Sequence, residues 1–189
     1  MLEEANDHDL LQIPAKTKPV NYTVQIIGRG KTKKYVQYSH DKDVWAFNDN
    51  ALNIPAQYLT GVFEMHPDYE TRYEGIVGCE DYLPFLRRYH PFPIWMHSST
   101  MDVPSSRRYP LESMYPIFFT GSASYALALA IYMGYERIEM YGIEAEKGTE
   151  YEKSRDALFF WMGRAEGAGI HLILHHENKL FSAPLYPFP

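Results

Sequence analysis

A short turn rich in glycine and basic residues follows the first apolar stretch of the chain, residues 22–27. The turn consists of Gly28, Arg29, Gly30, Lys31 and Thr32. Glycines let a backbone approach a ligand closely, and the two cations offset the charge of a phosphate. A P-loop needs another glycine where Gln25 stands, and the dinucleotide fingerprint needs one where Lys33 stands. The turn is therefore either a phosphate-binding turn of another type or a tight turn with solvated cations.

Two asparagines, Asn48 and Asn50, end the second apolar stretch, residues 43–48. An amide side chain offers both a donor and an acceptor to a base or a sugar. Asparagines are also common in Asx turns and helix caps. Because the first turn is expected nearby, we favour ligand binding for this pair.

Glu64 and His66 alternate at the end of the third apolar stretch, residues 61–66. Alternate residues of a strand share a face. Two such residues without an obvious third ligand are weak evidence for a metal, so we predict no metal site. A hydrogen-bonded histidine at a strand end is the common alternative, and we include both residues among the candidate ligand contacts.

A small-residue turn opens an almost wholly apolar helix, which Gly134 ends. The turn contains Thr120, Gly121, Ser122 and Ser124. Free N–H groups and the positive end of the helix dipole favour an anion there. The alternative is a capped core helix, with Ser122 as the capping residue.

Two further groups of polar residues follow later strands. Tyr141, Gly142 and Glu144 end the segment after the apolar helix, and an acid placed there can bind ribose hydroxyls or Mg2+. His175 and His176 follow the last strand, where a histidine can act as a general base. An exposed loop histidine is the commoner case.

Strands that alternate with helices predict an α/β fold with a mostly parallel sheet covered on both faces. Ligands of such sheets bind beyond the carboxyl ends of the strands, which is where the candidate residues stand. We expect an N-terminal arm over 1–20, one nucleotide-binding domain over 21–177 with an inserted functional loop over 98–119, and a proline-rich tail over 178–189. Helices are expected over 33–39, 80–89, 121–134 and 149–167.

Composition narrows the class of protein. The 189 residues carry a net charge of -6, which argues against broad nucleic-acid binding because that needs basic surface. Cys79 is the single cysteine, so an intrachain disulfide is excluded. No signal peptide or membrane-spanning apolar run is visible, so we expect no membrane association and a cytoplasmic location. The sequence leaves open whether the protein forms homo-oligomers.

Five motifs occur in an order that resembles a known superfamily. They read Ile-Ile-Gly-Arg-Gly-Lys-Thr, Val-Trp-Ala-Phe-Asn-Asp-Asn, Val-Phe-Glu-Met-His, Phe-Thr-Gly-Ser-Ala-Ser-Tyr and Gly-Tyr-Glu-Arg-Ile-Glu-Met-Tyr-Gly-Ile-Glu. The superfamily joins bacterial sialyltransferases of the lipooligosaccharide type, motility accessory factor glycosyltransferases and archaeal 6-hydroxymethylpterin diphosphokinase-like proteins. Short stand-alone versions resemble phage proteins. The resemblance spans residues 22–175 and implies a Rossmann-like three-layer fold of the sialyltransferase type.

The resemblance also implies a nucleotide site. It transfers nucleotide contacts to Gly28, Gly30, Asn48, Thr120, Gly121 and Ser122, and by approximate position phosphate contacts to Tyr141 and Tyr151. Lys31-Thr32 replaces the family's Pro-Ser, Glu144 replaces an Asp, and the family's general-base histidine does not align. His175, His176 and Glu144 are therefore the catalytic candidates. The lid domain of the full sialyltransferases is at most a remnant, over 98–119.

The expected function is that of a nucleotide- or nucleotide-sugar-binding transferase of the glycosyltransferase kind. One alternative is a Mg2+-dependent diphosphokinase of the pterin type, with Glu144 near the metal. Another is a non-catalytic nucleotide-binding accessory protein of a phage, which would act in the host cytoplasm. The expected ligand is a nucleotide or nucleotide sugar, with Mg2+ as an optional cofactor.

Overall fold

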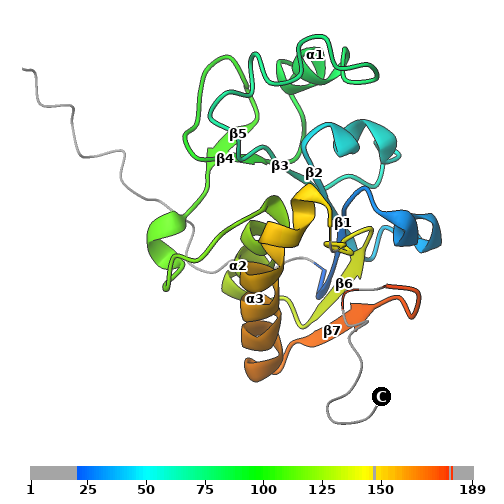
Figure 1. Cartoon of the computed structure of the whole chain (residues 1–189). Helices are drawn as coiled ribbons and strands as arrows, with labels where there is room; N and C mark the ends of the chain where they lie inside the picture. Colours follow the sequence, from blue (N-terminus) through cyan, green and yellow to red (C-terminus); the bar gives the residue numbers. More distant parts are fainter. Residues whose placement is uncertain (1–20, 147, 179, 181–189) are drawn as a thin grey trace, which may run out of the picture.

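A single parallel sheet organises the chain (Figure 1). In the computed structural model, the residues described are 21–146, 148–178 and 180, so the expected arm over 1–20 and most of the expected tail lie outside them. The seven strands run in the order β5-β4-β3-β2-β1-β6-β7. Their bounds are β1 Thr23–Ile27, β2 Asp43–Phe47, β3 Gly61–Phe63, β4 Ile94–Met96, β5 Ser106–Arg108, β6 Arg137–Tyr141 and β7 His171–Leu174. Every pair of neighbours is parallel, which confirms the expected α/β class.

Helices connect these strands. The α-helices are α1 Tyr82–Leu86, α2 Ser122–Met133 and α3 Arg155–Gly167. The 3-10 helices are η2 Lys31–Tyr35, η3 Asn48–Asn53, η4 Leu111–Ser113 and η5 Glu150–Ser154. The helix expected over 33–39 is thus a shorter 3-10 turn that starts earlier, and the segment expected as a loop over 98–119 contains strand β5.

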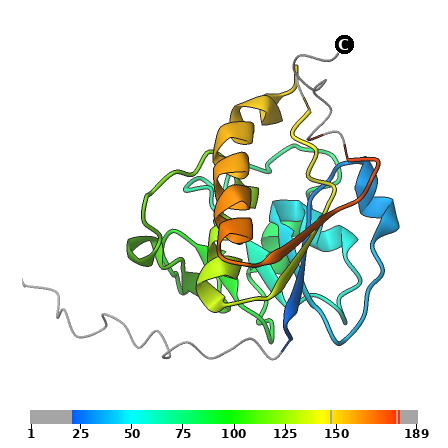
Figure 2. The ribbon, with the colours of Figure 1, turned by 90° about the horizontal axis from the view of Figure 1, so that it is seen from below.

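Helices α2 and α3 cover one face of the sheet and lie side by side in Figures 1 and 2. Helix α2 is rich in Ala and Leu, and its buried residues pack with Val24 and Ile26 of β1 and with α3. An apolar helix of this kind needs cover on most sides, which the sheet and α3 provide. Gly134 ends α2 at a φ of 81°, a left-handed conformation that suits glycine.

The opposite face is covered by shorter elements. Helices η3 and α1 lie over β2 and β3 around a second buried cluster that includes Val44, Val62 and Phe85. Next to this cluster the face turns polar, because Gln25 of β1 and the buried Glu139 of β6 hydrogen bond at 2.9 Å. Lys42 also reaches Glu139. No helix within the described ranges is long and apolar enough to cross a bilayer.

Candidate functional site

The ends of four strands meet at one edge of the sheet. In the strand register, Ile27 of β1 pairs with Ala46 on one side and Tyr141 on the other, and Phe47 pairs with Phe63. Because all strands run the same way, the residues that follow them emerge at the same edge. This confirms the expected alignment of the segments after β1, β2, β3 and β6.

The turns after β1 and β6 are in direct backbone contact. The N–H of Gly28 donates to the carbonyl of Tyr141 at 2.8 Å, and the N–H of Gly30 donates to the carbonyl of Gly142 at 2.9 Å. A Cβ on Gly28 would lie 2.3 Å from the oxygen of Gly142, so a side chain there would displace backbone. Gly142 has a φ of 63°, which independently favours glycine. The close approach of the two turns therefore requires glycine at both positions.

The carboxylate of Glu144 lies inside the turn after β1. Its Oε2 accepts from the N–H of Lys31 at 3.1 Å, and its Oε1 accepts from the N–H and hydroxyl of Thr32 at 2.8 and 2.7 Å. The Thr32 hydroxyl oxygen in turn accepts from the N–H of Gly142 at 2.8 Å. Two backbone N–H groups of the turn that was a candidate phosphate site thus bind a carboxylate of the protein itself. The side chains of Arg29 and Lys31 are what this turn presents outward.

The segment after β2 braces the same turn. The amide of Asn50 donates to the carbonyls of Ile27 and Gly28 at 3.0 and 3.3 Å, and its oxygen accepts from Lys33 at 3.2 Å. Asn50 is 1% exposed, so its side chain holds the end of β1 rather than facing outward. Asp49, which lies between the two predicted asparagines, is also buried and pairs with the Arg29 guanidinium.

Asn48 is different from its neighbours. Its φ of 51° lies in the left-handed region, which asparagine adopts more readily than most residues. Its side-chain oxygen is buried and has no hydrogen-bond partner within the described part of the chain. A buried acceptor without a partner costs free energy, so the Asn48 amide oxygen has hydrogen-bonding capacity that a ligand can use.

A buried carboxylate organises the end of β3. Glu64 has a side chain with 0% exposure, and its Oε1 contacts Nδ1 of His66 at 2.6 Å. The N–H of His66 donates to the same oxygen at 3.0 Å, and the Tyr73 hydroxyl donates to Oε2 at 3.0 Å. Burial raises the pKa of Tyr73, and the charge of Glu64 raises it further, so this phenol stays a proton donor.

Glu64, His66 and Tyr73 lie close to the charged residues of the turn after β1. Arg29 is near enough to Tyr73 for its charge to oppose the rise in the pKa of that phenol. The thiol of Cys79 donates to Asp49, the partner of Arg29, at 3.1 Å. The loop 67–81 thus joins the ends of β2 and β3. Tyr73 was not predicted because nothing in that polar, glycine-containing loop indicates which residue turns inward.

The start of α2 contacts η5. Ser154 donates to the carbonyl of Thr120 at 3.0 Å, and a Cβ on Gly121 would lie 2.6 Å from the Ser154 hydroxyl oxygen. Gly121 is the N-cap, and no side chain in the described part of the protein caps the helix, so Ser122 is the first helical residue and not the expected cap. The Ser124 hydroxyl donates back to the carbonyl of Gly121 at 2.6 Å.

The remaining sequence candidates have local partners. His175 stacks on Tyr35, with ring centroids 3.7 Å apart, and its other neighbour His176 is tilted against it at a centroid distance of 4.2 Å. The Tyr141 hydroxyl donates to Glu139 at 3.4 Å, which directs it over the sheet face. Among the described residues no group of three or more His, Cys, Asp or Glu side chains is placed to hold a metal ion.

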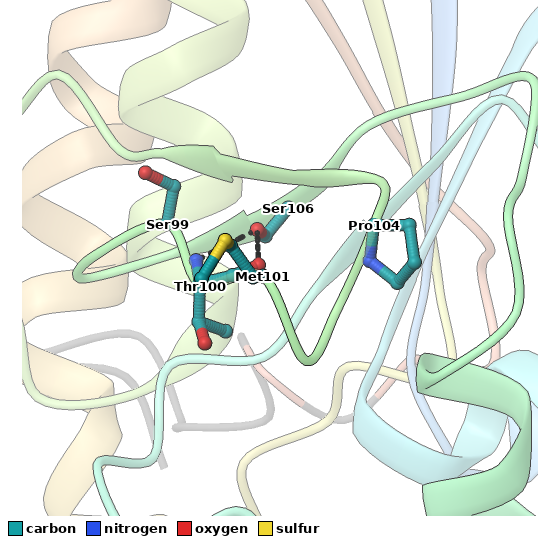
Figure 3. A pocket seen from close by; sticks show the side chains of 5 residues that line it. All are labelled: Ser99, Thr100, Met101, Pro104 and Ser106. Atoms are coloured by element: carbon teal, nitrogen blue, oxygen red, sulfur yellow. Dashed lines mark hydrogen bonds between the residues drawn. The ribbon is translucent and has the colours of Figure 1, made fainter.

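A pocket lies elsewhere, in the connection between β4 and β5. It has a volume of about 450 Å³ and is lined by Ser99, Thr100, Met101, Pro104 and Ser106 (Figure 3). The Ser106 hydroxyl bonds the backbone of Thr100 as both donor and acceptor, at 3.0 Å each. None of the residues predicted for the site lines this pocket.

Comparison with known proteins supports the fold assignment. No family model matches the sequence, and no curated protein sequence matches it. Solved structures do match: sialyltransferase CstII from Campylobacter jejuni with the substrate analogue CMP-3FNeuAc superimposes with a TM-score of 0.54 at 16% identity, covering 85% of this chain and 82% of that one. The chain has the fold of these sialyltransferases.

Two further structures give the same result. Monofunctional α-2,3-sialyltransferase Cst-I from Campylobacter jejuni matches with a TM-score of 0.55 at 14% identity, over 89% of this chain and 80% of that one. CstII with cytidine 5′-monophosphate matches with a TM-score of 0.51 at 19% identity, over 85% and 82%. The resemblance found in the motifs is thus confirmed as a likeness of fold.

Proposed function

We propose that this protein binds a nucleotide sugar at the carboxyl edge of its sheet and transfers the glycosyl group. The observation that carries the proposal is the gathering of four strand ends at that edge, where the buried amide oxygen of Asn48 has no hydrogen-bond partner among the described residues. The likeness to sialyltransferases that bind CMP and a CMP-sugar analogue supports a cytidine nucleotide as the first ligand to test.

Each part of the edge has a distinct proposed role. Arg29 and Lys31, both exposed, offset the phosphate charge. Asn48 hydrogen bonds to the base or ribose, because an amide can satisfy either edge. The start of α2, from Thr120 to Ser122, supplies N–H groups to phosphate.

Such a site works by holding the donor sugar against its acceptor and by stabilising the leaving phosphate. Both effects lower the barrier without covalent chemistry by the protein. Glu144 and Asn50 contribute indirectly, because their hydrogen bonds fix the turn that carries Arg29 and Lys31. The turn is therefore preorganised, which reduces the ordering needed when ligand binds.

Calorimetric titration with CMP, UMP, AMP and GMP tests the binding. We expect CMP to bind, and Asn48→Gly to weaken its binding about fivefold through loss of about 1 kcal/mol of hydrogen bonding. Glycine tolerates the positive φ, so the backbone is preserved. Asn53→Gly is the matched control, because Asn53 is exposed at the other end of η3. Failure of all four nucleotides to bind would overturn the proposal.

Release of CMP from CMP-sialic acid tests the transfer. We expect release by the wild-type protein, and faster release with a suitable acceptor sugar. Tight CMP binding with no release from any donor would instead identify a binding protein without this activity.

A further inference from the structure

We propose that His66, oriented by the buried carboxylate of Glu64, is the general base that removes the proton from the acceptor hydroxyl. This inference rests on the proposed function and adds to it a catalytic residue. The sequence had placed both residues among the ligand contacts, and the catalytic histidine among His175 and His176.

The geometry around Glu64 determines which nitrogen of the His66 imidazole carries the proton. The 2.6 Å contact joins Oε1 of Glu64 to Nδ1 of His66, which therefore carries the proton that the carboxylate accepts. Nε2 is then the ring nitrogen with the free lone pair. A histidine held by a carboxylate in this way can accept a proton at the opposite nitrogen, and the resulting cation is stabilised by that carboxylate.

The surroundings make this arrangement rigid. Glu64 is wholly buried, and its two oxygens receive hydrogen bonds from the N–H of His66, its ring and the Tyr73 hydroxyl. The buried Tyr82 hydroxyl also lies near, since the charge of Glu64 adds to the rise in its pKa that burial causes. A carboxylate satisfied by several donors stays in place and fixes the ring that contacts it.

The imidazole is also placed where a substrate can reach it. The side chain of His66 is 25% exposed while that of Glu64 is not exposed at all, so the ring lies between the core and solvent. Strand β3 neighbours β2, and Phe63 is in register with Phe47, directly before Asn48. Because paired strands lie about 5 Å apart, the Glu64–His66 pair and the amide of Asn48 occupy adjacent positions on the edge.

The proton transfer balances as follows. The acceptor oxygen forms a bond to the anomeric carbon as the bond from that carbon to the phosphate oxygen breaks. The nucleotide leaves as a monophosphate that takes the bonding electron pair. The hydroxyl proton moves to Nε2 of His66, and the imidazolium later releases it to water. When no acceptor sugar is present, water takes the place of the hydroxyl.

The other candidate histidines lack such an arrangement. His175 stacks on Tyr35, its ring is tilted against that of His176, and its Nδ1 accepts from the N–H of Glu177 at 3.2 Å. No carboxylate contact that orients this ring is found within the described ranges. His66 is therefore the better base.

The test measures CMP release from CMP-sialic acid in water, with CMP affinity measured in parallel. We expect His66→Asn to lower kcat about 100-fold or more, within the range for loss of a general base, with the CMP Kd changed less than twofold. His66→Ala should regain part of its rate with added imidazole, which a merely structural histidine would not show. Glu64→Gln should lower kcat about tenfold, because the amide cannot stabilise the imidazolium.

His171→Asn is the control, since His171 is exposed at the start of β7 on the opposite edge. Long-range 15N NMR of the wild-type imidazoles gives a second readout, with Nε2 of His66 expected to be the unprotonated nitrogen. If His66→Asn keeps full activity, or if imidazole rescues nothing in folded His66→Ala, the inference is overturned while the proposed function stands. A wild-type protein that neither binds CMP nor releases it overturns both.

Discussion

Glu144 and Thr32 lie 112 positions apart in the chain, yet one carboxylate oxygen of Glu144 accepts from both the N–H and the hydroxyl of Thr32. This contact closes the turn after β1 against the segment after β6. A Cβ on Gly30 would lie 1.4 Å from the other oxygen of Glu144, so the glycine makes room for the carboxylate. The turn is built around an internal anion.

We expect Glu144→Ala to lower the free energy of unfolding by about 1–3 kcal/mol, because it removes the acceptor of the N–H and hydroxyl of the buried Thr32. Urea denaturation measures the change. Glu146→Ala is the control, since Glu146 is exposed two residues further on. Equal stability of the two variants would mean that the carboxylate does not hold the turn.

The two cations of the first turn should behave differently. Arg29→Ala leaves the buried Asp49 without its guanidinium partner, so we expect a loss of about 1–3 kcal/mol in stability as well as weaker nucleotide binding. Lys31→Ala should weaken binding alone, because exposed charges contribute little to folding.

Calorimetry with CMP and parallel urea denaturation separate these effects. Arg88→Ala is the comparison for Lys31, because it removes an exposed cation near the end of α1. Unchanged CMP affinity in folded Lys31→Ala would show that this lysine is merely solvated.

Gly121 should be intolerant of a side chain at the start of α2. A Cβ there would lie 2.6 Å from the Ser154 hydroxyl oxygen, so Gly121→Val must displace the Ser154 side chain and obstruct the N–H groups behind it. We expect reduced CMP affinity and a lower Tm. Gly163→Ala is the control, because its Cβ would meet no atom within 4 Å. An unchanged Tm for Gly121→Val would contradict this account of the contact.

Acid should lower the free energy of unfolding in part because Glu139 becomes protonated. Burial alone raises the pKa of Glu139, but hydrogen bonds from Gln25, Lys42 and Arg137 outweigh it and hold the pKa below the ordinary value of 4.5. A carboxyl with a lowered folded-state pKa stabilises the protein above its unfolded pKa, and the contribution is lost as pH falls through the folded pKa.

Urea denaturation between pH 7 and pH 3 checks this expectation. The free energy of unfolding should fall less steeply with acid in Glu139→Gln than in the wild-type protein. Glu166→Gln, an exposed change on α3, should leave the dependence of the unfolding free energy on pH as it is in the wild-type protein. Identical slopes for Glu139→Gln and wild type would show that this network does not titrate with folding.

The sequence by itself determined the elements with strong local signals. The strand that follows the apolar helix ends at Tyr141 as expected, and the helix itself ends at Gly134 as expected. Apolar periodicity and a left-handed glycine act locally, so the sequence carries them directly. The same logic placed Gly28, Asn48 and Glu64 at one edge, because parallel strands end together.

Only the tertiary structure decided how those residues are used. Strand β5 has two exposed arginines among its three residues and forms by pairing with β4, so no local pattern predicts it. Likewise, Glu144 reaches Thr32 only because β6 pairs with β1, and Glu64 orients His66 only because the core buries its carboxylate. Side-chain roles of this kind depend on contacts between distant segments, and the spacing of residues along the chain does not encode them.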